Sequence, residues 1–184
     1  MSAALPSSNA SCIPNIESNV TTYMSIADDL AILEQQEHLL RFSSFNPETA
    51  WELGCCLRTL LMDCQAGGTI EIELADHLLF ACATPTSNPG QADWIRRKRN
   101  VVHRFGRSSY AIGRILEANN ETLQSRHGLK AADFAVHGGG FPILLEGTGA
   151  VGSVVMSGLP QRDDHNLVIS ALAKILDKDV PRLS

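Results

Sequence analysis

The spacing of apolar positions separates helical segments from strands along the chain. Apolar residues recur at every third or fourth position in several segments, which is the period of a helix with one buried face. The pattern predicts helices over residues 25–42, 47–66, 92–118 and 163–176. The second helix has a strong start at Asn46-Pro47-Glu48, where an Asn cap precedes a proline and an acid in the first turn.

Residues 69–74 alternate strictly between apolar and polar side chains, which predicts a strand with one face in the core. The two isoleucines and Leu74 point inward, so Glu71 and Glu73 should face water or a neighbouring subunit. Residues 78–83 are apolar on both sides and follow after a short turn. We expect the two segments to form an antiparallel hairpin.

Further strands are expected in the last third of the chain. Residues 141–145 and 151–156 are apolar on both faces, and residues 133–136 are expected to add a brief strand. Strands with two apolar faces need helices above and below the sheet. The sequence therefore predicts an α/β (α+β) fold in which helices cover both faces of one sheet.

The segment Gly147-Thr-Gly149-Ala-Val-Gly152 fits the G-x-G-x-x-G pattern of dinucleotide-binding proteins. That fingerprint needs a helix directly after the glycines, because the helix N-terminus binds the pyrophosphate. Here the chain continues as Ser153-Val-Val-Met, which is typical of a strand. We interpret the segment as a glycine-rich turn between two strands.

Length and composition favour one domain. The chain has 184 residues, 44% of them apolar, which is enough for a substantial core. Residues 1–22 are rich in Ser and Asn and are predicted to form a disordered tail, which leaves a single domain over residues 23–184. There is no run of 18 uncharged apolar residues, so no membrane insertion is expected.

The first 22 residues and the cysteines bear on the compartment. The first 22 residues carry no Lys or Arg, which argues against a secretory signal. The five cysteines are an odd number without C-x-x-C spacing, and three of them, Cys55, Cys56 and Cys64, fall within an apolar helical pattern. We expect reduced core cysteines in a cytoplasmic protein rather than a redox or zinc site.

Basic residues gather in one part of an acidic chain. The formal net charge is −5, yet the stretch from Arg96 to Arg107 holds six Lys or Arg residues and no acid. One local positive patch on an acidic body argues against nucleic acid as a partner. Two interpretations remain: a solvated or intersubunit helix face, or an anion site to which Arg97 or Lys98 contributes.

Two histidines lie beside chemically suggestive neighbours. His137 precedes Gly138, Gly139 and Gly140, whose bare backbone either donates amides to an anion or lets another part of the chain approach closely. Asp163-Asp164-His165 opens the last helix, where the acids suit the positive helix end. The positive electrostatic potential at the helix N-terminus should also keep His165 neutral, and a neutral imidazole can coordinate a ligand or accept a proton.

Catalytic and metal-binding motifs are not found in the sequence. There is no G-x-S-x-G elbow, no H-E-x-x-H pair and no carboxylate pair with an assignable general acid and base. We therefore assign no catalytic residue and no metal ligand. An enzyme with His165 as general base remains the weaker alternative.

Several segments taken together resemble a known superfamily. Trp94-Ile-Arg-Arg-Lys98, Gly139-Gly-Phe-Pro-Ile143 and Gly152-Ser-Val-Val-Met-Ser-Gly-Leu-Pro-Gln161 with Asp164-His165 look like the GlcG/HbpS-like (haem-degrading domain-like) superfamily, in an uncharacterised cytosolic branch. The resemblance implies a profilin-like, three-layer α/β/α domain with a five-stranded antiparallel sheet. It also implies assembly into homo-oligomers larger than a dimer.

The resemblance makes haem a candidate cofactor, because some members bind it. Their haem ligands do not map cleanly onto this sequence, so no haem-coordinating residue is carried over, and the cofactor stays unknown.

These observations lead to three hypotheses about function. The first is a homo-oligomer with a small anionic ligand in pockets at subunit boundaries. The second is an assembly scaffold or adaptor for other proteins, and the third is a haem-binding or haem-handling protein. For the first, the expected ligand-binding residues are Trp94, Arg97, Lys98, His137, Gly138, Gly139, Gly140, Asp164 and His165.

Overall fold

A computed structural model describes residues 25–184, so the tail predicted for residues 1–22 lies outside the described residues. In chain order the elements are α1 (Ile26–Leu39), α2 (Pro47–Asp63), β1 (Thr69–Leu74), β2 (His77–Ala83), α3 (Gly90–Phe105), α4 (Ser109–Ala118), α5 (Leu123–His127), β3 (Gly140–Leu145), β4 (Gly149–Ser157) and α6 (Gln161–Leu176).

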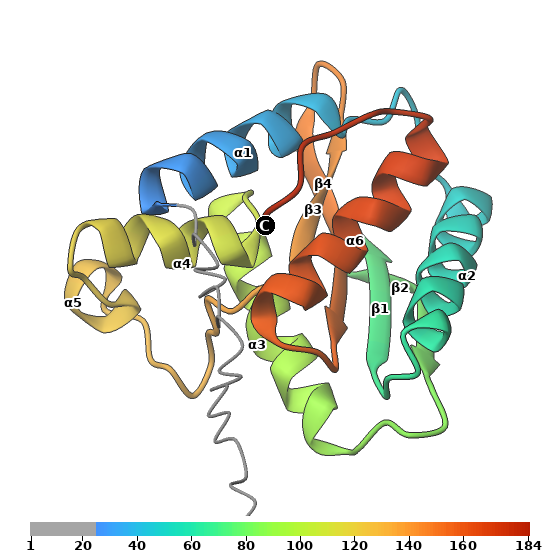
Figure 1. The fold of residues 1–184 in the computed structure, drawn as a ribbon, viewed down its shortest axis with the longest axis horizontal. Helices are drawn as coiled ribbons and strands as arrows, with labels where there is room; N and C mark the ends of the chain where they lie inside the picture. Colours follow the sequence, from blue (N-terminus) through green and yellow to red (C-terminus); the bar gives the residue numbers. More distant parts are fainter. Residues whose placement is uncertain (1–24) are drawn as a thin grey trace, which may run out of the picture.

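The sheet has the order β2-β1-β4-β3, and every neighbouring pair is antiparallel. Helices α2 and α6 pack on one face and α3 packs on the other, so the predicted three layers are confirmed (Figure 1). Helices α1 and α4 lie against each other beside the sheet. The core between the sheet and the α2–α6 layer includes the inward residues of β1, Ile70 and Ile72, as the alternation predicted.

Within residues 25–184 the sheet has four strands, so the expected five-stranded sheet is wrong for the described part of the chain. Residues 133–136 form a turn and an irregular segment, in which the Ala135 amide donates to Arg97 O of α3 at 3.1 Å. The backbone is thus bound to a helix instead of a strand edge. At the β3 edge a single parallel bridge joins Phe42 to Leu145.

The long helix expected over residues 92–118 is divided into α3 and α4. Gly106 caps α3 in a left-handed conformation (φ 62°), and the Ser108 side chain caps α4 by accepting from the Ala111 amide. Glu37 of α1 stabilises the break, because its carboxylate accepts from Arg107 Nε at 2.7 Å and from the Ser108 amide at 2.8 Å. The apolar stripe continues across the break, which is why the sequence pattern concealed it.

Glu73 does not face water, contrary to the alternation pattern, and only 5% of its surface is exposed. The β1–β2 pairing shifts register between Ile72 and Glu73. The Glu73 carboxylate lies against His103 and Arg99 of α3, and it accepts from the Ser153 hydroxyl at 3.3 Å. These partners compensate the buried charge.

The remaining predicted elements are confirmed within a few residues. The glycine-rich segment is the β3–β4 turn, where Gly147 and Gly149 take positive φ of 72° and 101°. It is followed by β4 and not by a helix, so it is no dinucleotide fingerprint. Within residues 25–184, no helix is both long and apolar enough to cross a membrane.

Candidate functional site

Four of the predicted site residues meet at one hollow. Trp94, Lys98, His137 and Asp164 line a space of about 320 Å³ between α3, the segment before β3 and the start of α6. The other walls of this polar hollow come from Asn88, Gly90, Gln91, Ser157, Gly158, Leu159 and Gln161, four of which have polar side chains. The structure therefore brings together residues from three distant parts of the chain.

A buried ion pair forms the floor of this hollow. Lys98 Nζ lies 2.7 Å from Asp164 Oδ2, and both side chains are almost fully buried. Lys98 also donates to Met156 O at 3.0 Å, and Asp164 Oδ1 accepts from the Leu159 amide at 2.8 Å. The pair thus joins α3 to the end of β4 and to the first turn of α6.

The ion pair changes the role expected for Lys98. Burial lowers the pKa of Lys98 and raises the pKa of Asp164, while the short contact between them opposes both changes. Because the lysine charge is already matched inside the fold, Lys98 is not a free cation for an anionic ligand. Asp164 serves Lys98 as counterion and also bonds the Leu159 amide ahead of α6.

The three glycines lie where the backbone is crowded. A Cβ on Gly138 would lie 1.8 Å from Gln161 O, and one on Gly139 would lie 2.4 Å from Met156 O. Gly139 also has a φ of 113°, which other residues rarely adopt. The Gly140 amide donates to the Ser109 hydroxyl at 3.0 Å, so this amide is not free for an anion. Close approach of neighbouring chain segments accounts for the glycines, and the hypothesis of an amide cradle is wrong for Gly140.

His165 lies inside the core with none of its surface exposed. The Gln36 amide nitrogen donates to Pro181 O at 2.7 Å, so its oxygen faces His165 Nε2 at 2.8 Å and accepts the ring proton. His165 Nδ1 is buried and has no hydrogen-bond partner among residues 25–184. Burial, helped by Arg162, lowers the pKa of His165 to about 3.

The lowered pKa agrees with the expected neutral His165, although its main cause is burial and not the helix N-terminus. The assignment of His165 to the ligand site is wrong, because the side chain is enclosed by the core. The ring lies beside Tyr110 and Phe141, with centroid distances of 5.4 and 6.3 Å, and lines neither the polar hollow nor its neighbours. It therefore cannot touch a ligand or act as a general base there.

His137, Trp94 and Arg97 form an accessible cluster at the rim of the hollow. The His137 ring meets Trp94 edge-on, with centroids 4.9 Å apart, and the Arg97 guanidinium lies 4.1 Å from the Trp94 ring centroid. Burial, followed by the charges of Lys98 and Arg97, lowers the pKa of His137. His137 lines two further hollows, an apolar one of about 440 Å³ and a smaller one of about 200 Å³.

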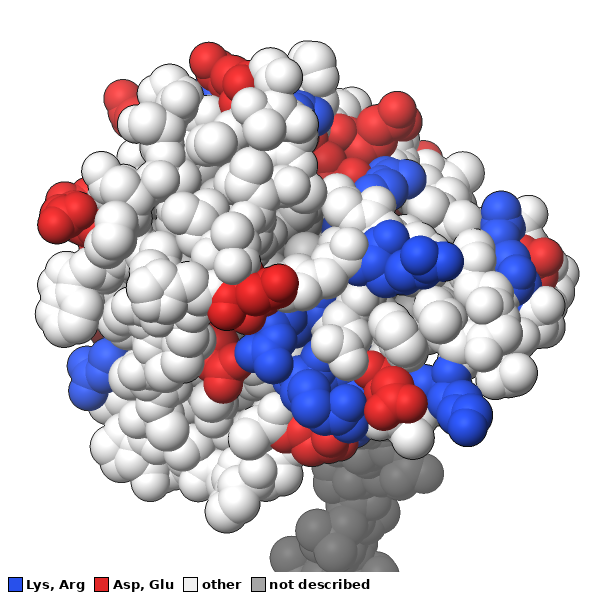
Figure 2. Space-filling model, turned by 180° about the vertical axis from the view of Figure 1, so that it is seen from behind, with Lys and Arg blue, Asp and Glu red and all other residues white. Residues whose placement is uncertain are grey.

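The basic stretch of α3 is not the uncompensated positive patch that we expected. Arg96 lies 2.9 Å from Asp93, Arg99 lies 2.6 Å from Glu71, and Lys98 is paired with Asp164. Figure 2 shows Lys and Arg side chains next to Asp and Glu on the face seen from behind. The acids come from neighbouring turns and from other elements, so the sequence of the basic stretch alone does not predict these ion pairs.

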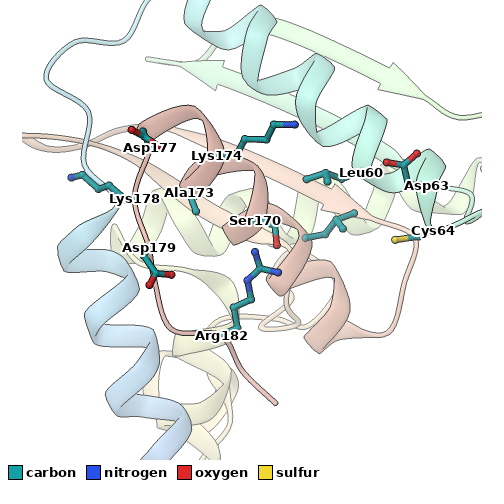
Figure 3. A pocket seen from close by; sticks show the side chains of 11 residues that line it. Leu60, Asp63, Cys64, Ser170, Ala173, Lys174, Asp177, Lys178, Asp179 and Arg182 are labelled. Carbon is teal, nitrogen blue, oxygen red and sulfur yellow. The ribbon is translucent and has the colours of Figure 1, made fainter.

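The largest hollow lies away from these residues. It has a volume of about 880 Å³ and lies between the end of α2, α6 and the segment after α6 (Figure 3). Its charged lining is balanced, with three acids and three cations: Asp63, Asp177, Asp179, Lys174, Lys178 and Arg182. None of the predicted site residues lines it, and the balanced charge selects no ligand.

One cluster has a donor set that could hold a metal ion, a role that the sequence did not suggest. Glu73, Asp76 and His103 each offer one ligand atom, and these atoms lie within 4.8 Å of one another. Glu73 already has His103, Arg99 and Ser153 as partners, which accounts for its burial without an ion. The cluster is at the turn between β1 and β2, apart from the polar hollow.

Comparison with known proteins identifies the family. A family model described as haem degrading protein HbpS-like matches residues 45–173. The chain belongs to the HbpS-like family. A UPF0303 protein of Serratia proteamaculans is 49% identical over 86% of this chain and 98% of its own length, and one of Rhizobium johnstonii is 46% identical over 87% and 98%. The resemblance seen in the sequence is therefore confirmed.

Solved structures share the HbpS-like fold. The crystal structure of the Ybr137w protein is 27% identical, covers 81% of this chain and 90% of its own, and has a TM-score of 0.75. The crystal structure of HbpS (14% identity, 74% and 92% covered, TM-score 0.57) and that of the PduOC:heme complex (13%, 77% and 99%, TM-score 0.61) agree in fold alone.

The HbpS-like family makes haem a ligand to test against the residues present. A haem iron takes an axial ligand such as histidine, and the macrocycle needs apolar surroundings. His165 is enclosed by the core and bonded to Gln36, so it does not fit. His137 fits, because its exposed ring lines the apolar hollow of about 440 Å³.

A double-mutant cycle tests the role of the buried pair. Lys98→Met should lower the free energy of unfolding by about 3–5 kcal/mol, because it leaves the Asp164 carboxylate buried without a counterion. Lys98→Met combined with Asp164→Leu should recover at least half of that loss, since no buried charge remains. Urea unfolding followed by circular dichroism measures both. A single-variant cost below about 1 kcal/mol would show that the pair is not a structural requirement.

The pH dependence of stability tests the burial of His165. Unfolded histidine has a pKa near 6.5, whereas the folded value is about 3, so the unfolded state binds more protons between these pH values. Stability should therefore fall as the pH drops, with about 2 kcal/mol from this residue between pH 7 and pH 5. Urea unfolding of His165→Gln should show a correspondingly smaller pH effect, while the exposed control His77→Gln should behave as the unmodified protein does.

Proposed function

We propose that the protein is a homo-oligomer that binds a small carboxylate ligand at Arg97 and His137. The observation that supports this is a partly exposed guanidinium held in place beside two hollows that share His137. The sequence left Arg97 and Lys98 as candidate cations for the ligand. We assign the role to Arg97, because Lys98 is already neutralised by Asp164.

Arg97 is oriented and only partly compensated. Its Nε donates to Asp93 Oδ2 at 2.8 Å, and its flat face stacks on Trp94. Asp93 is shared with Arg96, which has a second carboxylate partner in Asp133 at 3.4 Å. In the part of the chain that is described, the terminal nitrogens of Arg97 have no hydrogen-bond partner. A fixed guanidinium with two free donors is suited to a carboxylate, which it binds through two parallel hydrogen bonds.

The surroundings of His137 supply further hydrogen-bond donors for an anion. Burial, followed by the charges of Lys98 and Arg97, lowers the pKa of His137, which favours the neutral imidazole. A neutral imidazole there can donate one N–H to the ligand, while Gln161 on the same hollow offers amide groups. Trp94 supplies a flat apolar surface that contacts both the Arg97 guanidinium and the His137 ring.

The exposed side of β2 supports assembly with further copies. β2 is an edge strand of the sheet, and the stretch from Leu78 to Ala83 carries no charge. Leu78 is 50% exposed, and Ala81 and Ala83 are exposed as well. An uncharged, open edge strand favours pairing with another chain. Cys55, Cys56, Cys64 and Cys82 are free thiols, which fits the proposed cytoplasmic location.

Substitution of Arg97 tests the proposed ligand site. In propionate titrations followed by 15N–1H NMR, Arg97→Gln should weaken binding about tenfold to a hundredfold, because a hydrogen bond to a charged group is lost. Arg96→Gln is the matched control, since Arg96 is on the same helix turn but lines none of the three hollows around His137. Equal propionate binding by both variants would contradict the proposal.

Native mass spectrometry of the protein from its own host adds the subunit number and the mass of any bound molecule. A larger assembly that carries no small molecule, and binds no propionate, would instead favour the scaffold hypothesis.

Haem is a second candidate ligand, supported by the family and by the position of His137. One structural neighbour is described as a haem complex, and His137 lines the apolar hollow. Hemin should then give a Soret band that saturates at one equivalent per chain. His137→Ala should abolish this band, whereas His127→Ala, which changes an exposed histidine outside that hollow, should leave it unchanged. A band that survives His137→Ala would exclude axial ligation by His137.

A further inference from the structure

We infer that the ligand of the Arg97–His137 site is an amphipathic monocarboxylate whose apolar part occupies the hollow beneath α5. The inference rests on the proposed function and adds the chemical class of the ligand. It is supported by the position of a second, apolar hollow directly beside the residues that receive the carboxylate.

The walls of this hollow are apolar. It encloses about 440 Å³ between α4, α5 and the segment before β3, and its lining includes Leu116, Leu123, Leu129, Phe134 and Val136. These residues belong to a small hydrophobic cluster separate from the main core. A cavity of this size with mostly apolar walls and few polar groups is typical of a small-molecule site.

The charges around the hollow select a single carboxylate. Among the described residues, Arg97 is the one Lys or Arg in its lining, and it is next to His137. The other charged lining residues are acids, Glu117 and Glu121, each paired with an arginine outside the lining, Arg114 and Arg126. A second carboxylate would find acids and no uncommitted cation, so a dianion is disfavoured.

The neighbouring polar hollow explains why the apolar part should turn toward α5. Its walls carry Asn88, Gln91, Gln161 and the Lys98–Asp164 pair. Lys98, Asp164 and Gln91 are already hydrogen-bonded within the protein. An alkyl or aryl group placed there would remove the Asn88 and Gln161 amide groups from water without giving them hydrogen-bond partners. A carboxylate at His137 can reach both hollows, but only the one beneath α5 gains from burying apolar surface.

A homologous series of straight-chain carboxylates tests the inference. With the full chain, NMR titrations from propionate to octanoate should show affinity rising about fourfold per added methylene until the hollow is full. In complexes with octanoate, intermolecular nuclear Overhauser effects should join its terminal methyl group to the methyl groups of Leu116 and Leu123.

Two matched variants test whether the gain in affinity with chain length arises in the hollow beneath α5. Ala131 is an exposed residue in the lining of this hollow, and its neighbour Ala132 is exposed outside it. Ala131→Trp should remove the dependence on chain length, whereas Ala132→Trp should leave both this dependence and propionate binding unchanged. Retained 15N–1H spectra show that both variants fold.

The outcomes separate the inference from the proposed function. Equal affinity across the series, or a gain that survives Ala131→Trp, overturns the inference, and the proposed function stands if propionate binding still requires Arg97. If propionate binding does not require Arg97, the proposed function fails, and the inference fails with it.

Discussion

The buried ion pair between Lys98 and Asp164 is the interaction on which the site depends. Two charges removed from water are stable only when both are matched and their remaining polar atoms are bonded. Met156 O and the Leu159 amide meet that condition, and Gly139 leaves room for the Lys98 ammonium because it has no side chain. The positions of α3, the end of β4 and the start of α6 are thereby coupled, and they define the hollow.

Adjacent residues on α3 thus have different tasks. Successive positions on a helix point about 100° apart, so Lys98 faces the sheet while Arg97 lies across Trp94 at the surface. Lys98, the inner cation, joins α3 to β4 and α6, and loss of its ion pair with Asp164 would lower the free energy of unfolding. The outer cation keeps free donors and sits beside His137. Substitutions at these neighbouring positions should therefore affect stability and the proposed ligand binding separately.

The spacing of apolar residues located most helices and strands, because a helix or strand with one buried face needs apolar residues at regular intervals. It missed features that depend on partners distant in the chain. The α3–α4 break requires Glu37 from α1, and the burial of Glu73 requires Arg99 and His103 from α3. The sequence predicted only a helix-capping role for Asp164, because no local pattern indicates that Lys98 is its ion-pair partner. The sequence predicted that several residues of the candidate site are neighbours, but it could not show that Lys98 is paired with a buried acid.

The positions of the open strand and of the candidate ligand site bear on how assembly and binding relate. β2 lies with α2 at one side of the molecule, whereas α4 and α5 lie at the opposite side (Figure 1). Assembly through β2 alone would leave the hollow beneath α5 open to solvent. A pocket completed by a neighbouring subunit would instead need a second contact through α4 and α5. Since Leu123 and Leu129 already give that hollow apolar walls within one chain, the proposed ligand site would not need the second contact.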